Sequence, residues 1–155
     1  MARVIALDHV VIRVSNFERS RLFYTRLFAF LGFECIDDFN ETVGWRNGRI
    51  AFWIVAGCNG ALPSSGVPAA GLHHCGLELR SRKDVDELQS FLLAQGAEIV
   101  DHAAEYYEDY YAVYFKDPDG LKLEGMAYGP RYLHGARRKQ ARSAPGIESQ
   151  GKAAP

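Results

Sequence analysis

Two stretches of alternating apolar and polar positions mark corresponding points in the two halves of the chain. They are LDHVVIRVSN at 7–16 and LHHCGLELRS at 72–81, and they align at an offset of 65 residues. Alternation with a period of two predicts a β-strand with one apolar face in each stretch. Apolar residues at helical spacing follow both strands; they are Phe23, Leu27, Phe30 and Leu31, then Val85, Leu88, Phe91 and Leu92. The chain therefore repeats one pattern twice.

The two predicted helices share start and stop signals. Ser15-x-x-Glu18 and Ser81-x-x-Asp84 have the form of capping boxes, and a glycine follows each helix, in LGFE and QGAE. Short segments rich in aromatic and β-branched residues then predict three strands per half. These strands are expected at 33–38, 42–46 and 49–56, and at 97–102, 110–116 and 121–127, with turns at Asn47-Gly48 and Asp119-Gly120.

Each half therefore reads as a β-α-β-β-β module. The predicted fold class is α+β, with two βαβββ modules forming a curved mixed sheet around a shared cavity and the helices outside. The expected organisation is a single domain over 1–130, with module one at 5–56, a linker at 57–70 and module two at 71–128. Residues 131–155 are poor in apolar residues and are predicted to form a disordered basic tail.

Charge and cysteine content narrow the function classes. The tail holds six basic residues and one acid, which leaves twelve basic and eighteen acidic residues in 1–130. An acidic body does not indicate nucleic-acid binding. Cys35, Cys58 and Cys75 are widely spaced and define no disulfide framework or cysteine zinc site. With no signal segment or long apolar run, we expect a cytoplasmic protein that does not associate with membranes.

Polar residues on the predicted strands suggest a metal site. His74 shares a strand face with Gly76 and Glu78, and the repeat places His9 at the matching position. Glu124 lies mid-strand among apolar neighbours, where an unpaired carboxylate is costly and a divalent cation removes the cost. His9, His74 and Glu124 are therefore the predicted ligands of one divalent metal ion, in a 2-His-1-carboxylate set.

The neighbouring histidine is predicted to be uninvolved. His73 matches Asp8 in the repeat, and adjacent strand residues point to opposite faces. We therefore expect His73→Ala to keep the metal and His74→Ala to lose it.

Together these segments resemble the vicinal oxygen chelate superfamily, which includes glyoxalase I, bleomycin-resistance proteins, fosfomycin-modifying thiol transferases and extradiol dioxygenases. The resemblance covers about residues 5–128 and rests on DHVVIRV, SRLFYTRLFAFLGFE, GLHHCGLEL and FKDPDGLKLEGM. It implies paired βαβββ modules around a metal of the Fe, Mn, Zn, Ni or Co type, with ligands at His9, His74 and Glu124. Modules of this kind pair within a chain or between two chains, so we expect a homodimer.

The resemblance also implies a small-molecule enzyme, either a lyase or isomerase or a ring-cleaving dioxygenase. Glu124 and Tyr114 are the predicted catalytic residues, and Arg13 and Tyr111 are predicted to bind substrate. The family's fourth ligand position falls on Phe52, or on Trp53 after a one-residue slip, and neither side chain binds metal. The dioxygenase signature asks for a histidine where 105–107 read Glu-Tyr-Tyr. The alternative is a bleomycin-resistance-like protein that sequesters its ligand without catalysis.

Overall fold

The structure is a computed structural model that describes residues 2–4, 6–48, 50–57 and 72–132. The elements follow the predicted order twice. Module one contains β1 (His9–Val14), α1 (Phe17–Phe30), β2 (Glu34–Phe39), β3 (Thr42–Asn47) and β4 (Ile50–Ala56). Module two contains β5 (Cys75–Glu78), α2 (Arg82–Ala94), β6 (Ile99–Tyr107), β7 (Tyr110–Lys116) and β8 (Lys122–Tyr128).

Each module forms its own four-stranded mixed sheet. The strand orders are β1-β4-β3-β2 and β5-β8-β7-β6. The first strand of each module runs parallel to the last one, and the other pairs are antiparallel. The predicted α+β class with two βαβββ modules is confirmed, and within the described part of one chain the two sheets are not hydrogen-bonded to each other.

The helix caps match the sequence signals with one shift. Ser81 caps α2 as predicted, since its side chain accepts from the backbone N–H of Asp84. In module one the cap is Asn16 instead of Ser15, because Asn16 Oδ1 accepts from the N–H of Arg19. Ser15 is used elsewhere, in a contact between the modules described below.

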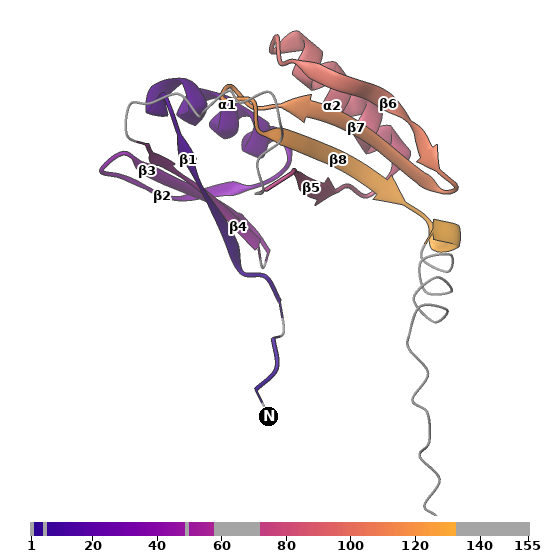
Figure 1. Cartoon of the computed structure of the whole chain (residues 1–155), viewed down its shortest axis with the longest axis horizontal. Helices are drawn as coiled ribbons and strands as arrows, with labels where there is room; N and C mark the ends of the chain where they lie inside the picture. The colour runs from indigo at the N-terminus through magenta and orange to yellow at the C-terminus, as the bar shows by residue number, and fades with distance from the viewer. Residues whose placement is uncertain (1, 5, 49, 58–71, 133–155) are drawn as a thin grey trace, which may run out of the picture.

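Each helix covers one face of its own sheet and builds a core there. From α1, buried Tyr24 and Phe28 pack their rings against Trp45 and Phe52. From α2, the buried side chains are Val85, Leu88 and Leu92. The opposite faces of both sheets are left without a helix, and Figure 1 shows α1 and α2 along the same side of the molecule.

The two modules meet through their helices and through the β7–β8 turn. Phe30 of α1 stacks on Phe91 of α2 with ring centroids 4.3 Å apart. The Tyr24 hydroxyl donates to Asp117 Oδ2 at 2.8 Å. Asp119 accepts from the backbone N–H of Ser15 at 2.7 Å and also from the Ser15 hydroxyl. The DPDG turn of module two is therefore anchored to the start of α1 in module one, and we call this contact the turn latch.

Two predictions lie largely outside the described residues. The linker at 57–70 is described only at Gly57, and the tail at 131–155 only at Arg131 and Tyr132. Among the described residues, no helix is long and apolar enough to cross a membrane.

Candidate metal centre

Glu124 is a buried carboxylate in the middle of β8. It is 3% exposed, on the face of the module-two sheet that α2 does not cover. The hydroxyl of Tyr110 donates to Glu124 Oε1 at 2.6 Å, and His74 Nε2 lies 3.2 Å from Oε2. Gly76 pairs with Glu124, and a Cβ at this glycine would lie 3.3 Å from Oε2. The strand thus leaves room for the carboxylate beside the imidazole.

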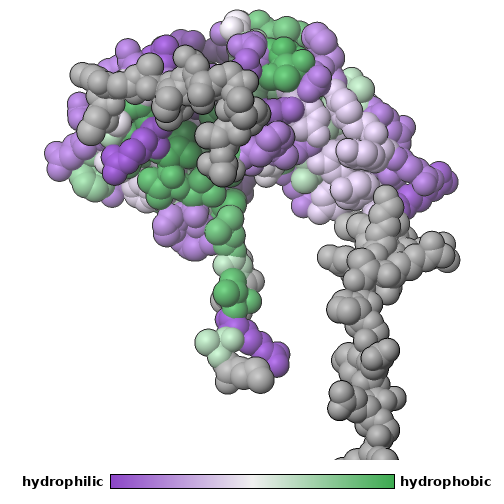
Figure 2. Space-filling view, in the orientation of Figure 1, coloured by the Kyte–Doolittle hydropathy of each residue, from purple (hydrophilic) through white to green (hydrophobic). Residues whose placement is uncertain are grey.

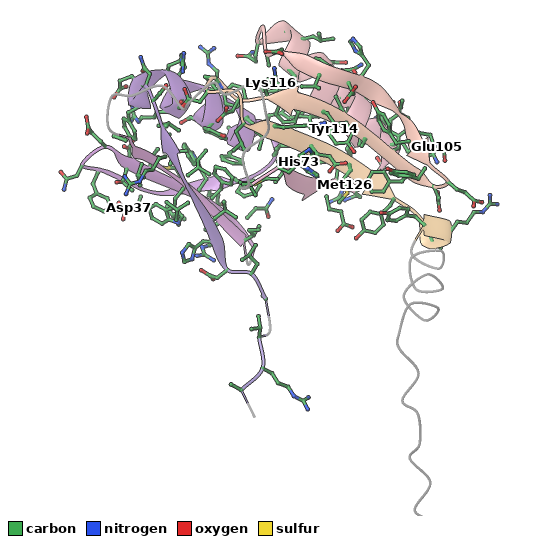
Figure 3. The ribbon with its side chains drawn as sticks, in the orientation of Figure 1. Asp37, His73, Glu105, Tyr114, Lys116 and Met126 are labelled. Atoms are coloured by element: carbon green, nitrogen blue, oxygen red, sulfur yellow. The ribbon has the colours of Figure 1, made fainter. Side chains whose placement is uncertain are left out.

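Tyr114 lies directly opposite Glu124 on β7. Burial and interaction with Glu124 raise the pKa of the Tyr114 hydroxyl, so it stays protonated at neutral pH and serves as a hydrogen-bond donor. Lys122 Nζ lies 4.3 Å from the centre of its ring, and Tyr106 packs edge-on against it. Figure 3 shows Tyr114 on this open sheet together with His73 and Met126.

Tyr111, predicted to bind substrate, lies on the other face of the sheet. Its hydroxyl donates to Asp86 of α2 at 2.8 Å, and Arg82 lies over its ring. The side chain is therefore turned away from Glu124, because neighbouring strand residues alternate between faces. The preceding Tyr110, which the sequence pattern did not single out, is the tyrosine that contacts Glu124.

Further tyrosines extend the site along the sheet. The Tyr110 ring contacts those of Tyr107, Tyr128 and Tyr132, with centroid distances of 5.8, 6.4 and 4.6 Å. The Tyr128 hydroxyl donates to Glu78 at 3.0 Å. Burial raises the pKa of Tyr110, with Glu124 as the second cause. This face therefore offers aromatic surfaces with hydroxyl groups beside one buried carboxylate.

His9 and Arg13 lie on the open face of module one. His9 Nδ1 is 3.0 Å from Asp8 Oδ2, and the His9 side chain is 55% exposed. Val11 shares this face and is 51% exposed. The Arg13 guanidinium approaches the carbonyl oxygen of Ala56 at 3.5 Å. Figure 2 shows an apolar patch, in green, near β1 and β4 with polar residues beside it.

The structure brings together two of the three predicted ligands. His74 and Glu124 are adjacent, whereas His9 belongs to the other module. Among the described residues of a single chain, no group of three or more His, Cys, Asp or Glu side chains could hold a metal ion. The three-ligand site stays a prediction. It requires the two modules to be paired differently from the way they lie within this single chain.

The strand pairing identifies the counterpart of Glu124 in module one. Gly76 pairs with Glu124 in module two, and its repeat equivalent Val11 pairs with Trp53 in module one. Trp53 therefore occupies the fourth ligand position, and Phe52 is buried beneath α1. Gly44 opposite Trp53 has no space for a side chain, since a Cβ would lie 2.5 Å from the indole. A tryptophan ring thus replaces a possible fourth ligand.

His73 does not point away from His74, contrary to the prediction. The two Nδ1 atoms are 2.6 Å apart, and the rings meet edge to face. Both residues precede β5, which begins at Cys75. The alternation of a strand therefore does not apply to them, and the His73 ring is free to turn toward its neighbour.

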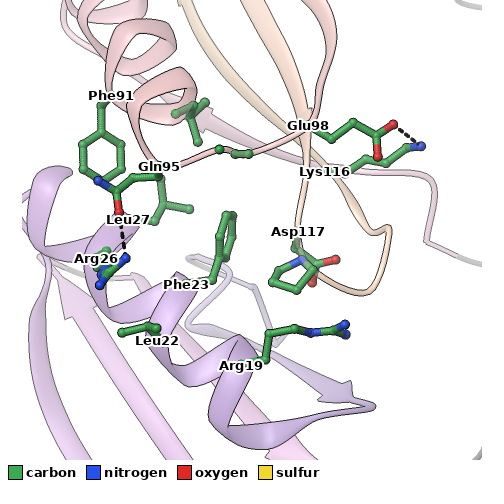
Figure 4. A pocket seen from close by; sticks show the side chains of 14 residues that line it. Arg19, Leu22, Phe23, Arg26, Leu27, Phe91, Gln95, Glu98, Lys116 and Asp117 are labelled. Carbon is green, nitrogen blue, oxygen red and sulfur yellow. Dashed lines mark hydrogen bonds and ion pairs between the residues drawn. The ribbon is translucent and has the colours of Figure 1, made fainter.

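A separate cavity of about 380 Å³ lies between the two helices. Figure 4 shows Phe23, Leu27 and Phe91 in its wall. Two polar contacts cross its edge: Arg26 donates to Gln95 at 3.0 Å, and Lys116 donates to Glu98 at 2.6 Å. None of the predicted site residues lines this cavity, so it is distinct from the candidate metal centre.

Known proteins share this fold and sequence pattern. The uncharacterized protein YqjT of Bacillus subtilis (strain 168) is 27% identical over 125 residues, which is 78% of this chain and 98% of that protein. The crystal structure of a candidate glyoxalase from Bacillus halodurans has a TM-score of 0.69 and 28% identity. The match covers 78% of this chain and 94% of the glyoxalase chain. A lactoylglutathione lyase from Agrobacterium tumefaciens has a TM-score of 0.62 and 18% identity. The match covers 81% of this chain and 96% of the lyase chain. At that identity it supports the fold alone.

The family assignment rests on most of the chain. Residues 6–124 match a family model that spans both modules and ends at Glu124. This range agrees with the repeat, the two sheets and the shared structures described above. The chain belongs to the Glyoxalase/Bleomycin resistance protein/Dioxygenase superfamily.

Proposed function

We propose that this protein is a divalent-metal-dependent enzyme that acts on a small molecule with two adjacent oxygen atoms. The observation that carries the proposal is the pairing of His74 with the buried Glu124 on an open sheet face. Oε1 of this carboxylate already accepts from the Tyr110 hydroxyl, and a cation beside Oε2 and His74 would offset the remaining cost of burying the charge.

The donor set fits such a cation. His74 Nε2 and Glu124 Oε2 are 3.2 Å apart, close enough for both to lie ~2.1 Å from one ion of the zinc type. Imidazole and carboxylate donors suit Fe, Mn, Zn, Ni and Co. Module two supplies two of the three expected ligands, and His9 in module one is the expected third ligand.

A second copy of the chain is the proposed source of His9. The module-one face around His9 holds the apolar side chains of Val11, Trp53 and Val55 in a hollow of about 360 Å³, which Asp8, Thr42 and Arg46 also line. The module-two face carries the buried carboxylate. In a homodimer, module one of each copy would cover module two of the other, which would bury these apolar side chains and complete two sites.

The protein side chains have distinct roles in this proposal. The bound metal would act as a Lewis acid toward the substrate oxygens. Tyr110 would hold the Glu124 carboxylate by its hydrogen bond. Tyr114 stays protonated and would donate to a substrate oxygen, while Arg13 on the opposing module would attract an anionic substrate group.

The reaction class follows from what surrounds the metal. An isomerase that shuttles a proton between carboxylates on both sides of the metal needs a partner for Glu124, and Trp53 occupies that position. The three-ligand set leaves positions open for substrate and for O₂. Oxygen uptake by the iron-loaded protein with a panel of catechols would support the dioxygenase class. Absence of uptake, with turnover of a 2-oxoaldehyde thiol adduct, would support the lyase or isomerase class.

The alternative is a protein that sequesters its ligand. The ring contacts of Tyr110, Tyr128 and Tyr132 favour it, since stacked aromatic surfaces bind planar molecules without any catalytic step. Tight binding of a planar ligand to metal-free protein, without product formation, would support this alternative over the enzyme.

Complementation between two defective chains tests the shared site. His9→Ala and Glu124→Gln chains, each with its own affinity tag, are made separately and co-expressed, and the heterodimer is isolated through both tags. We expect neither homodimer to retain zinc and the heterodimer to retain one zinc, because one of its two sites receives only wild-type ligands. A heterodimer without zinc, beside zinc-loaded wild-type protein, would contradict pairing between chains. Wild-type protein unable to bind any of the five metals would contradict metal dependence.

A further inference from the structure

We propose that Asp8 and His73 are matching positioning residues, each of which hydrogen-bonds the Nδ1 of the histidine that follows it and aims the Nε2 at the metal. This inference rests on the proposed function. It assigns a shared role to two residues that the ligand set itself does not include.

The contacts are equivalent in the two modules. Asp8 Oδ2 is 3.0 Å from His9 Nδ1, and His73 Nδ1 is 2.6 Å from His74 Nδ1. The 65-residue offset of the repeat superposes Asp8 on His73 and His9 on His74. In both modules the residue before the histidine therefore contacts the same ring nitrogen, although one partner is a carboxylate and the other an imidazole.

These contacts favour one tautomer of each ligand in the proposed metal-bound state. A neutral imidazole has one N–H and one lone pair. An ionised carboxylate only accepts, so His9 carries its proton on Nδ1, where it donates to Asp8, and the lone pair is on Nε2. His74 directs its Nε2 at Glu124 Oε2, 3.2 Å away. Without a metal, the Glu124 carboxylate accepts from this Nε2–H. In the proposed metal-bound state Nε2 would instead hold the metal, so the His74 proton would lie on Nδ1 and be donated to the bare Nδ1 of His73.

The two partners differ in strength. A charge-assisted hydrogen bond is stronger than one between neutral groups, and a partner on the distal nitrogen raises the basicity of a ligating imidazole. Asp8 is itself held by an ion pair, since Arg46 approaches its other oxygen at 3.7 Å. We therefore expect His9 to be the stronger of the two imidazole ligands and loss of Asp8 to weaken binding more than loss of His73.

Zinc affinity measures the positioning role. Metal-free full-length protein is titrated with Zn²⁺ in competition with a chromophoric chelator. Substitutions of groups that orient a ligating histidine weaken metal binding by roughly 10–100-fold, which is the range expected for Asp8→Ala and His73→Phe. His73→Asn keeps an acceptor and should recover most of the affinity. His102→Phe is the matched control, because this exposed histidine bonds Gln89 away from the site.

Long-range ¹H–¹⁵N spectra of the zinc-loaded protein supply a second readout. In the wild-type spectrum, His9 and His74 should both appear as Nδ1–H tautomers with Nε2 bound to zinc. Asp8 and His73 would not determine these tautomers if they only stabilised the fold. Thermal unfolding of the metal-free variants checks that His73→Phe and Asp8→Ala are folded.

The outcomes separate this inference from the proposed function. If His74→Ala and Glu124→Gln bind zinc as tightly as wild type, the proposed function fails. A second outcome is that those variants lose zinc while the zinc affinities of Asp8→Ala and His73→Phe stay within about threefold of wild type. That loss is smaller than the roughly 10–100-fold expected when a partner of a ligating histidine is removed, and the positioning role is refuted. A weaker affinity in both variants, with rescue by His73→Asn, supports it.

Discussion

The hydrogen bond between Tyr24 and Asp117 gives a direct measure of how firmly the two modules are joined. Tyr24 is fully buried in module one, and its hydroxyl donates to a buried carboxylate oxygen of module two at 2.8 Å. Tyr24→Phe keeps the ring, which packs between Phe28 and Phe52, and removes only this donor. The substitution therefore isolates the energy of one bond across the module boundary.

The expected magnitude follows from the acceptor. Hydrogen bonds to charged groups contribute about 1.5–3 kcal/mol. The two backbone donors that Asp117 keeps, the N–H groups of Asp119 at 2.9 Å and Leu121 at 2.8 Å, both bond Oδ1, whereas Tyr24 bonds Oδ2. They do not replace the lost donor at Oδ2, so we expect the free energy of unfolding to fall by about 1.5–3 kcal/mol, which corresponds to a Tm lower by roughly 3–12 °C for a chain of this size.

Urea and thermal denaturation at one fixed protein concentration measure the loss, because dimerisation would make the Tm concentration-dependent. Tyr107→Phe is the matched control: Tyr107 is 65% exposed, and its loss of a hydroxyl should change stability by less than ~0.5 kcal/mol. If Tyr24→Phe costs no more than this control, the bond does not join the modules and the reasoning fails.

Three further substitutions test the core, the pH dependence and the site. Gly125→Ala should cost about 1–3 kcal/mol in urea denaturation through overpacking, since the new Cβ would lie 2.3 Å from Leu88 Cδ2; unchanged stability would refute the tight packing. Burial raises the pKa of Asp117, so its contribution to stability is complete below the ordinary aspartate pKa of about 3.9 and is lost as pH rises through the raised value. Wild-type stability relative to Asp117→Asn should therefore fall as the pH rises above about 4, and a rise with pH in urea titrations would contradict the sign. Tyr110→Phe removes the donor to Glu124 and should weaken zinc binding about tenfold or more in the chelator competition, with equal affinity as the contrary result.

The repeat in the sequence predicted the architecture because each module has its own local signals. Alternation, capping and glycine stops recur at the same offset, so the order of strands and helices could be read without knowing how they pack. β6 (Ile99–Tyr107) is longer than the predicted strand at 97–102 and takes in the first tyrosines of EYYEDYY. Asp109, with φ of 63°, then makes the turn to β7.

Side-chain direction was harder to predict where the pattern is uniform. Tyr110 and Tyr111 are adjacent and identical, so only the register of β7 decides which one faces Glu124, and a one-residue error reverses the face. His73 precedes its strand, where alternation carries no information. The sequence of one chain does not distinguish pairing within it from pairing between copies, because both would use the same strand faces.

The turn latch has a consequence for a dimer of the proposed kind. Asp119 contacts Ser15, which directly follows the strand bearing His9, and β8 with Glu124 begins shortly after the same turn. In a swapped pair these two ligands of one chain belong to different metal ions. The turn latch would then link the two metal sites through a short stretch of chain. Metal binding at one site would change the metal affinity of the other, with the same coupling free energy in both directions.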